Sequence, residues 1–333
     1  MVSVDSFYFP TGIDAARRYA RFLEESLFES IWVADSQQLY TDAYVTLAVC
    51  AMETETLGLR TGVTNPVSRH PSVTANAIAT VNQLSGDRAG IGIGAGDSGV
   101  YSIGKQPAKA SELHEAVEQI QTLLSGDAVE FGGEEFVLKQ ANGTVKVHVA
   151  AEGPVTLRMA GQVVDGIMFG GGSAPDVIRS VAHENLRVGA ERAGKSLDDL
   201  EITTLTPGCV ADTREEATRT LMHMLEPIAY HNFSHSVESA PEELHDDLRR
   251  LVEAHEFREH GDQDARSPEE LPQRVQDYLG ERWAIAGPPE YCRERLRALD
   301  DVGVDNVMIT FPTGAPLEHA REFDRTVLRP MSE

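Results

Sequence analysis

The stretch TGVTNPVSRHPSVTANAIATVNQLSGDRAGIGIGAGDS, residues 61–98, contains the pattern that decides the fold. It begins within an apolar run, Leu57–Val63, and continues into an alanine-rich segment, Thr74–Leu84, whose spacing predicts a helix. The pair Ser85-Gly86 is typical of a helix C-cap, and the next apolar run, Ala89–Ile93, follows within three residues. Strand, helix and strand in this order indicate a sheet with parallel strands.

The same alternation continues outward from this stretch in both directions. Eight short apolar runs predict strands at Val2–Phe9, Ser30–Ala34, Leu57–Val63, Ala89–Ile93, Val145–Ala150, Gly166–Phe169, Ile202–Val210 and Val307–Phe311. Helical spacing lies between them at Asp14–Ser26, Thr74–Leu84, Ala110–Leu124, Thr156–Val164, Pro175–Ala193 and Pro289–Asp300. An open doubly wound sheet is the alternative. The count of eight and the late return of the last strand favour a (β/α)₈ barrel that spans residues 1–333 as one domain.

Two segments interrupt the repeat. Phe131–Thr144, with Gly132-Gly133 and Asn142-Gly143, predicts a hairpin loop before the fifth strand. Residues 213–285 follow the seventh strand and start with the helical run Arg214–Ile228, which predicts a helical insertion within the barrel domain. Its acidic parts are Glu238–Asp247 and His260–Glu270. This insertion could be a lid, an oligomer contact or a solvated surface.

The charge composition narrows the classes of partner. The formal net charge is -24, and lysine occurs only at positions 105, 109, 139, 146 and 195. Nucleic acids and anionic membranes call for basic patches, so neither is an expected partner. An acidic, lysine-poor surface is typical of proteins from a high-salt cytoplasm, where screening weakens self-repulsion. We therefore expect a halophilic source.

Other features of the sequence assign no further class. Met1–Pro10 lacks the basic flank of a signal peptide, and no apolar stretch has membrane-spanning length, so we expect a soluble, cytoplasmic protein. Cys50, Cys209 and Cys292 are far apart and predict neither disulfides nor a zinc site. His223, His231 and His235 fall in the insertion, and without an accompanying carboxylate pattern they are interpreted as structural rather than metal-binding.

Candidate functional residues follow the predicted strands, because the active site of such a barrel lies at the carboxyl ends of its strands. The fourth strand runs into Gly94-Ala95-Gly96-Asp97-Ser98, where glycines allow close approach to a flat ring and the carboxylate can accept hydrogen bonds from ring N–H groups. A dinucleotide fingerprint is the weaker interpretation of Gly94-x-Gly96-x-x-Gly99, since it follows the fourth strand and not the first. Gly170-Gly171-Gly172 precedes a predicted helix, and its N–H groups could hold a phosphate.

Two further strand ends carry polar residues. Gly62-Val63-Thr64-Asn65 closes the third strand and could position a ring through backbone and side-chain hydrogen bonds, while Arg69 and His70 are either ligand contacts or part of a solvated loop. Asp35, beside Ser36, ends the second strand, where burial would raise its pKa and suit it for acid–base work. Asp35 and Asp97 are therefore the candidate catalytic residues.

These features together resemble the bacterial-luciferase-like superfamily, and within it the deazaflavin-dependent methylenetetrahydromethanopterin reductase branch. The resemblance is carried by residues 61–98 and by EGPVTLRMAGQVVDGIMFGGG, residues 152–172, with Ala160 and Asp165-Gly166 before the glycine loop. It implies a homodimeric or larger assembly and coenzyme F420 at the mouth of the barrel, with its phosphate at Gly170–Gly172. It also implies a non-prolyl cis peptide at Gly62-Val63 and ring contacts from Asp35, Thr64 and Asp97.

Three functions remain open at this point. The leading one is an F420-dependent oxidoreductase that transfers hydride to or from a small substrate, such as a methylene group on a tetrahydromethanopterin or tetrahydrofolate carrier. FMN-dependent members of the superfamily share the barrel and the glycine loops, so an FMN monooxygenase is the alternative. A catalytically silent barrel that binds a flavin or deazaflavin is the hypothesis from another class.

Overall fold

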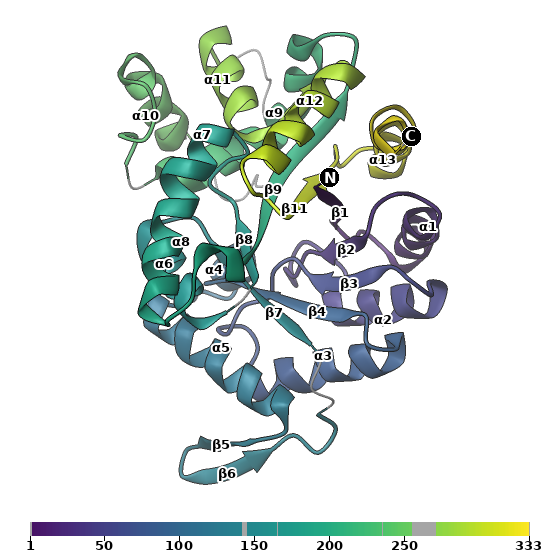
Figure 1. The fold of residues 1–333 in the computed structure, drawn as a ribbon, viewed down its shortest axis with the longest axis vertical. Coiled ribbons are helices and arrows are strands. Elements are labelled where there is room, and N and C mark those ends of the chain that lie inside the picture. Colours follow the sequence, from purple (N-terminus) through teal and green to yellow (C-terminus); the bar gives the residue numbers. More distant parts are fainter. Residues whose placement is uncertain (1, 142–144, 165, 235, 255–270, 333) are drawn as a thin grey trace.

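Residues 2–141, 145–164, 166–234, 236–254 and 271–332 are described by a computed structural model of the chain. Eight parallel strands form a closed barrel that is surrounded by helices (Figure 1). They are β1 (Ser3–Tyr8), β2 (Ser30–Val33), β3 (Gly58–Thr61), β4 (Ala89–Ile93), β7 (Lys146–Ala151), β8 (Gly166–Phe169), β9 (Glu201–Val210) and β11 (Asn306–Thr310). Each pairs with the next, and β11 also pairs with β1. The predicted barrel is confirmed, and the open sheet is excluded because the ring of pairings is complete.

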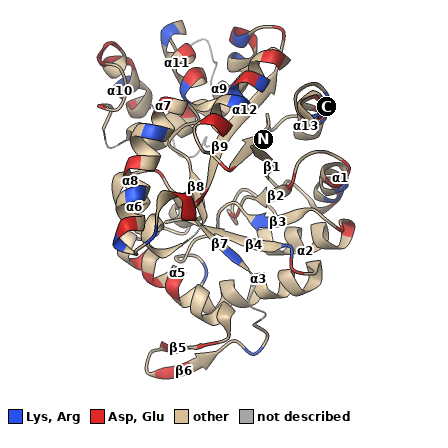
Figure 2. Cartoon of the chain, viewed as in Figure 1, with Lys and Arg blue, Asp and Glu red and all other residues tan. Residues whose placement is uncertain are grey.

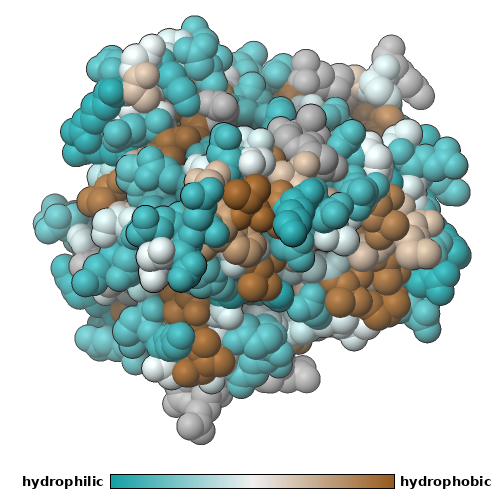
Figure 3. Space-filling view, turned by 90° about the horizontal axis from the view of Figure 1, so that it is seen from below, coloured by the Kyte–Doolittle hydropathy of each residue, from teal (hydrophilic) through white to brown (hydrophobic). Residues whose placement is uncertain are grey.

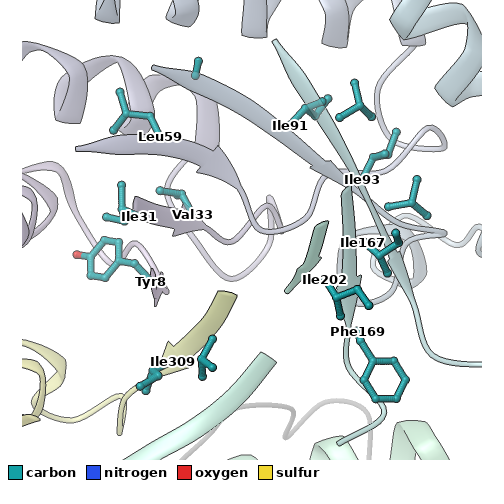
Figure 4. Close-up of a cluster of buried hydrophobic side chains, with 14 of the residues drawn as sticks. Tyr8, Ile31, Val33, Leu59, Ile91, Ile93, Ile167, Phe169, Ile202 and Ile309 are labelled. Carbon is teal, nitrogen blue, oxygen red and sulfur yellow. The ribbon is translucent and has the colours of Figure 1, made fainter. Parts of the chain in front are cut away.

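Alternation along the strands separates two kinds of interior. Residues that face the surrounding helices are mostly aliphatic, such as Ile31 and Val33 of β2 and Ile91 and Ile93 of β4, and they form the main core (Figure 4). Inside the barrel, the buried carboxylate of Asp5 instead accepts a hydrogen bond from the Trp32 indole at 2.8 Å and pairs with Arg60 at 3.0 Å. Burial raises the pKa of Asp5, which the Arg60 guanidinium opposes. The interior of the barrel around Asp5, Trp32 and Arg60 is therefore filled by side chains and is not a channel.

The outer helices follow the predicted pattern, with further helices that the sequence analysis did not predict. They are α1 (Ile13–Glu24), α2 (Ala43–Glu53), α3 (Pro71–Ser85), α4 (Ser98–Tyr101), α5 (Ala110–Ser125), α6 (Pro154–Val163), α7 (Pro175–Val177), η1 (Ile178–His183), α8 (Glu184–Arg192), η2 (Leu197–Asp199), α12 (Pro289–Asp301), α13 (Pro316–Phe323), η6 (Asp324–Leu328) and α14 (Arg329–Ser332). The sequence analysis missed α2 because it is apolar on nearly all sides and shows no polar stripe. It also missed α13.

The hairpin before the fifth barrel strand starts earlier than predicted. Its strands are β5 (Ala128–Phe131) and β6 (Glu134–Val137), and Gly132-Gly133 forms the turn with positive φ at both residues. The first strand was overlooked because Ala128–Phe131 is short and half exposed, so it lacks a strong apolar run. Asn142 and Gly143 of the predicted loop lie outside the described residues.

The segment between β9 and β11 is helical where it is described. It contains α9 (Arg214–Phe233), η3 (Glu242–Leu244), α10 (His245–Ala254), α11 (Gln273–Trp283) and the short strand β10 (Ile285–Gly287), which extends alongside the end of β9. Its helices bury a separate cluster of apolar side chains that includes Leu221, Leu225, Leu248, Leu279 and Trp283. The acidic stretch His260–Glu270 lies outside the described residues, as do Asp165 and His235.

The charged residues lie mainly on the outer helices. Acidic residues are spread over most of the outer helices, and basic residues are fewer (Figure 2). Within the described ranges, no helix is both long enough and apolar enough to cross a membrane.

Candidate active site

An apolar floor lies inside the barrel at the carboxyl ends of the strands. It consists of Phe7, Val63, Ala150 and Leu205, which are partly exposed and pack on the buried side chains of Trp32, Met168 and Met308. Because these residues face inward in a closed barrel, we infer that solvent reaches them through its mouth. The floor therefore offers a surface on which a flat aromatic ring could rest.

The segment after β3 is held tightly against β4. The Gly62-Val63 peptide bond is cis, as the resemblance implied. Thr64 N–H donates to Gly92 O and Gly94 N–H donates to Thr64 O, both at 2.9 Å. A Cβ added at Gly94 would lie 3.1 Å from Val63 Cγ2, so glycine lets this part of the floor approach β4 closely.

Asn65 fixes the next turn of the same loop. Its Oδ1 accepts hydrogen bonds from Val67 N–H at 3.1 Å and Ser68 N–H at 2.8 Å. The predicted residues of this segment thus lie together beside the floor, but the side chain of Asn65 is engaged in shaping the loop.

Asp35 lies in a polar recess between β2 and α2. Burial raises the pKa of Asp35, while the neighbouring Thr64 hydroxyl and Arg69 guanidinium act in the opposite direction. Arg69 pairs with Asp42 at 3.0 Å and lies over the ring of Tyr44 at 4.6 Å. Within the described chain, the buried hydroxyl oxygens of Tyr44 and Thr64 have no hydrogen-bond partner. Such groups are costly when left unsatisfied, so this recess has capacity for a polar ligand group.

His70 is placed away from this recess, at the start of α3. Its ring nitrogen caps the helix by accepting from Ser72 N–H, and its ring contacts Phe131 of the hairpin. His70 therefore caps a helix, whereas Arg69 lies near Asp35.

The loop after β4 joins the loop after β2. Ser98 and Ser36 share a hydrogen bond between their hydroxyl groups at 3.0 Å, and Gln37 Nε2 donates to Gly99 O. Gly96 has φ +100°, and a Cβ there would collide with Val100. These contacts bring Asp97, the residue before α4, to the same mouth as Asp35.

The loop Gly170–Gly172 is held from its carbonyl side. Gly170 O accepts from Trp283 Nε1 at 3.2 Å, and Gly171 O accepts from Arg282 Nε at 3.3 Å. Gly172 O accepts from Thr204 Oγ1 at 3.2 Å. Among the described residues, the N–H groups of Gly171 and Gly172 have no hydrogen-bond acceptor. The loop therefore presents donors at the start of the helical run from α7 to α8, as an anion site requires.

The sequence analysis did not select Glu152, which lies beside His231. Glu152 follows β7, and its Oε2 lies 3.3 Å from Nε2 of His231 on α9. Glu152 could have been found by the rule that selected Asp35, because it is a carboxylate at the end of a predicted strand. The partner could not, since nothing in the sequence indicates which face of the insertion turns toward the barrel.

Another histidine of the insertion, His223, lies in an ordinary environment. His223 bonds through Nδ1 with Thr220 O at 3.1 Å, and burial lowers its pKa. In the described part of the chain, no three potential metal ligands lie together.

Comparisons with known proteins find relatives of one family, both by sequence and by structure. The family model for luciferase-like monooxygenases matches residues 5–306. The 5,10-methylenetetrahydromethanopterin reductase of Archaeoglobus fulgidus is 30% identical over 315 residues and covers 89% of either chain. The enzyme of the same description from Methanolobus tindarius is 28% identical over 313 residues, or 91% of either chain. The structure of the coenzyme F420-dependent tetrahydromethanopterin reductase from Methanopyrus kandleri superimposes with a TM-score of 0.79 at 21% identity, over 99% of both chains.

Proposed function

The chain belongs to the luciferase-like monooxygenase family, and from this membership we propose that it is a coenzyme F420-dependent oxidoreductase. Full-length similarity to reductases that use tetrahydromethanopterin supports this branch over the oxygen-using one. The observation that carries the proposal is the mouth itself, where an apolar floor lies between a polar recess and a loop of free N–H groups.

The residues at the mouth fit a deazaflavin. Phe7, Val63, Ala150 and Leu205 would support its ring, and the unsatisfied hydroxyl of Thr64 would bond the polar edge. The N–H groups of the Gly170–Gly172 loop would hold its phosphate. When bound, this coenzyme supplies hydride chemistry at its C5 carbon, and the protein supplies orientation and a sheltered pocket.

We assign protonation control to the two carboxylates predicted from the sequence. Asp35 can hold a proton to higher pH than an ordinary aspartate, because burial raises its pKa. Asp97 lies across the mouth on the loop after β4, where Gly94, Gly96 and Ser98 complete the proposed cofactor contacts. The insertion, residues 213–285, belongs in this proposal to the same domain because α11 holds the glycine loop.

For the substrate we propose a methylene group on a tetrahydromethanopterin-type carrier, which makes the reaction a reduction of that group. The support is the similarity to two archaeal reductases over about nine-tenths of the chain. Methylene-tetrahydrofolate is the related carrier to test beside it.

The test is a fluorescence titration of the purified protein with F420 and FMN in parallel, in high-salt buffer. We expect micromolar or tighter binding of F420 and much weaker binding of FMN. Turnover of reduced F420 is then followed with each methylene carrier. Preferential FMN binding, with oxygen-dependent product, would move the protein to the monooxygenase branch. F420 binding without turnover of either carrier would leave a silent barrel or another substrate.

We also propose that the protein is a homodimer that pairs through α2 and α3. These neighbouring helices expose Val45 and Met52 on α2 and Val73 and Leu84 on α3, with Met52 75% exposed. Apolar areas are visible in brown on the face seen from below in Figure 3. The one charged residue of α2, Glu53, is neutralised by Arg17 and Arg21 of α1. A helix that is apolar on nearly all sides requires cover on its outer face, and a second copy provides a self-complementary one.

A further inference from the structure

Glu152 occupies a position inside the mouth that no predicted role uses. Side chains alternate along β7, so Glu152 stands on the same face as Ala150, two residues nearer the mouth than the floor. A Cβ on Gly170 would collide with Glu152 Oε1, which places this carboxyl group against the glycine loop. Glu152 therefore lies between the floor, where a ring would rest, and the proposed phosphate loop.

Two elements of the chain supply the groups around Glu152. From α9, His231 Nε2 lies 3.3 Å from Glu152 Oε2, and the neighbouring Tyr230 acts electrostatically on Tyr101, whose pKa is raised. From the loop after β4, the charge of Asp97 acts on both Glu152 and Tyr101. The third neighbour, the glycine loop, has no side chains. Glu152 is thus next to one base and one further acid.

The solvent exposure of the two side chains indicates the direction in which a proton would pass between Glu152 and His231. The side chain of Glu152 is 33% exposed, whereas that of His231 is 53% exposed. Burial raises the pKa of Glu152, as does the Asp97 carboxylate, while His231 lowers it. When one of two neighbouring carboxyl groups has its pKa raised, that group becomes the acid of the pair. Glu152 can hold a proton inside, and His231 can exchange one with solvent.

We propose that Glu152 is a catalytic proton donor of this site and that His231 resupplies its proton. The inference rests on the proposed function. As a hydride from the reduced deazaflavin forms a C–H bond at the methylene carbon, one C–N bond of the methylene bridge breaks and its electron pair stays on that nitrogen. Glu152 donates its proton to the nitrogen and becomes a carboxylate. His231 in its protonated form then passes a proton to Glu152 and takes another from solvent, which receives the N–H proton that the oxidised deazaflavin loses, so the charge and the protons balance.

The first test measures kcat with reduced F420 and methylene-tetrahydromethanopterin as a function of pH. An acid must be protonated, so the wild type should lose rate as pH rises through the titration of Glu152. Glu152→Gln should lower kcat by about 10²–10⁴-fold and abolish this loss. Because His231 lowers the pKa of Glu152, His231→Gln should move the loss of rate to higher pH. The affinity for F420, measured by fluorescence, should change less than about twofold in either variant.

A matched control is available on α5. His114 Nε2 and Glu118 Oε1 also lie 3.3 Å apart, but this pair is on the surface, with Glu118 63% exposed. Glu118→Gln should leave kcat and its pH profile unchanged. A wild-type kcat and pH profile in Glu152→Gln would overturn the inference.

The second readout needs neither cofactor nor substrate. The Glu152 carboxyl carbon is followed by ¹³C NMR as a function of pH in the wild type, in His231→Gln and in His114→Gln. We expect the midpoint to move to higher pH only in His231→Gln, and an unmoved midpoint would show that His231 does not act on Glu152 and would overturn the pairing. If the wild type binds no F420, the proposed function fails by that result alone. If it binds F420 but does not reduce the carrier, the NMR titration still tests whether His231 acts on Glu152.

Discussion

At the scale of single residues, two threonines of one segment are in opposite situations. Thr61 Oγ1 donates to Gly92 O at 2.8 Å and accepts from Gly92 N–H at 3.0 Å. Thr64 Oγ1 is equally buried but has no partner among the described residues. The first hydroxyl bonds the backbone of β4, whereas the second lies beside Asp35 and Tyr44 and is available to a ligand.

We therefore predict that Thr64→Val weakens F420 binding without lowering stability. Removing an unsatisfied buried hydroxyl is nearly neutral or stabilising for the fold. The loss of one hydrogen bond to the ligand should raise the Kd about 2- to 10-fold, which corresponds to roughly 0.5–1.5 kcal/mol. Thermal unfolding and a fluorescence titration measure the two effects.

Thr61→Val is the matched control. It removes both hydrogen bonds to Gly92 and should cost about 1–3 kcal/mol of unfolding free energy. Equal loss of stability in the two variants would contradict the assignment of Thr64 to ligand binding.

At the scale of elements, α11 fixes the shape of the glycine loop. Arg282 is buried, donates to Gly171 O, and reaches Ser239 O at 3.1 Å and Tyr278 OH at 2.7 Å. Its guanidinium lies over the ring of Trp283 at 4.6 Å. A helix of the insertion thus holds a loop of the barrel, because Arg282 and Trp283 bind the carbonyl groups of Gly171 and Gly170.

We predict that Arg282→Lys weakens F420 binding more than its loss of stability would suggest. Lysine lacks the planar fork that contacts three acceptors at once and cannot stack in the same way. The unfolding free energy should fall by about 1–3 kcal/mol, and the Kd for F420 should rise about tenfold because the loop loses its fixed shape. Both are measured at a temperature where the variant is fully folded.

Arg249→Lys on α10 serves as the control for this charge-conserving change. Its side chain is 55% exposed and pairs with the exposed Asp246. Neither stability nor affinity should change measurably. If Arg282→Lys behaves like Arg249→Lys, the insertion does not shape the phosphate site.

At the scale of the whole molecule, the surface has two opposite properties. It is strongly acidic, with a net charge of -24, yet α2 and α3 expose apolar side chains with few charges. The acidic surface favours separation of two copies of the chain, and the apolar face favours their association. Each property leads to a prediction that can be measured.

The apolar face of α2 and α3 predicts a dimer that a single charge disrupts. Met52→Asp or Val73→Asp should raise the dimer dissociation constant at least about 30-fold, the effect of losing roughly 2 kcal/mol at a central contact. Val155→Asp changes an equally exposed valine on α6 and should leave the dimer intact. Sedimentation equilibrium gives the masses, and a wild-type monomer at micromolar concentration would refute the interface.

The acidic surface predicts salt-dependent stability. Screening at about 1 M salt shortens the range of repulsion to roughly 3 Å, so the melting temperature should rise steadily with KCl. Thermal unfolding at KCl concentrations from about 0.1 M to about 3 M gives the melting temperature as a function of salt. Over the first part of this range the screening length falls from about 10 Å to about 3 Å. Full stability in dilute buffer would reject a halophilic adaptation.

The sequence by itself determined the barrel and most of its mouth. Alternating apolar runs and helical spacing identified eight strands because burial on both sides leaves a local, periodic record. The rule that sites follow strand ends then selected Asp35, Thr64, Asp97 and the glycine loop, which follow the carboxyl ends of β2, β3, β4 and β8 in the structure.

Only the tertiary structure decided which of these groups are already occupied and what stands opposite them. Asn65 binds its own loop, Thr64 has no partner, and Glu152 meets His231 across 79 positions of sequence. The helix α2 could not be predicted from the spacing of apolar residues, because both of its faces are apolar. Contacts between distant segments depend on how the insertion turns over the barrel, and that orientation is set by packing of the whole chain, which leaves no local pattern to read.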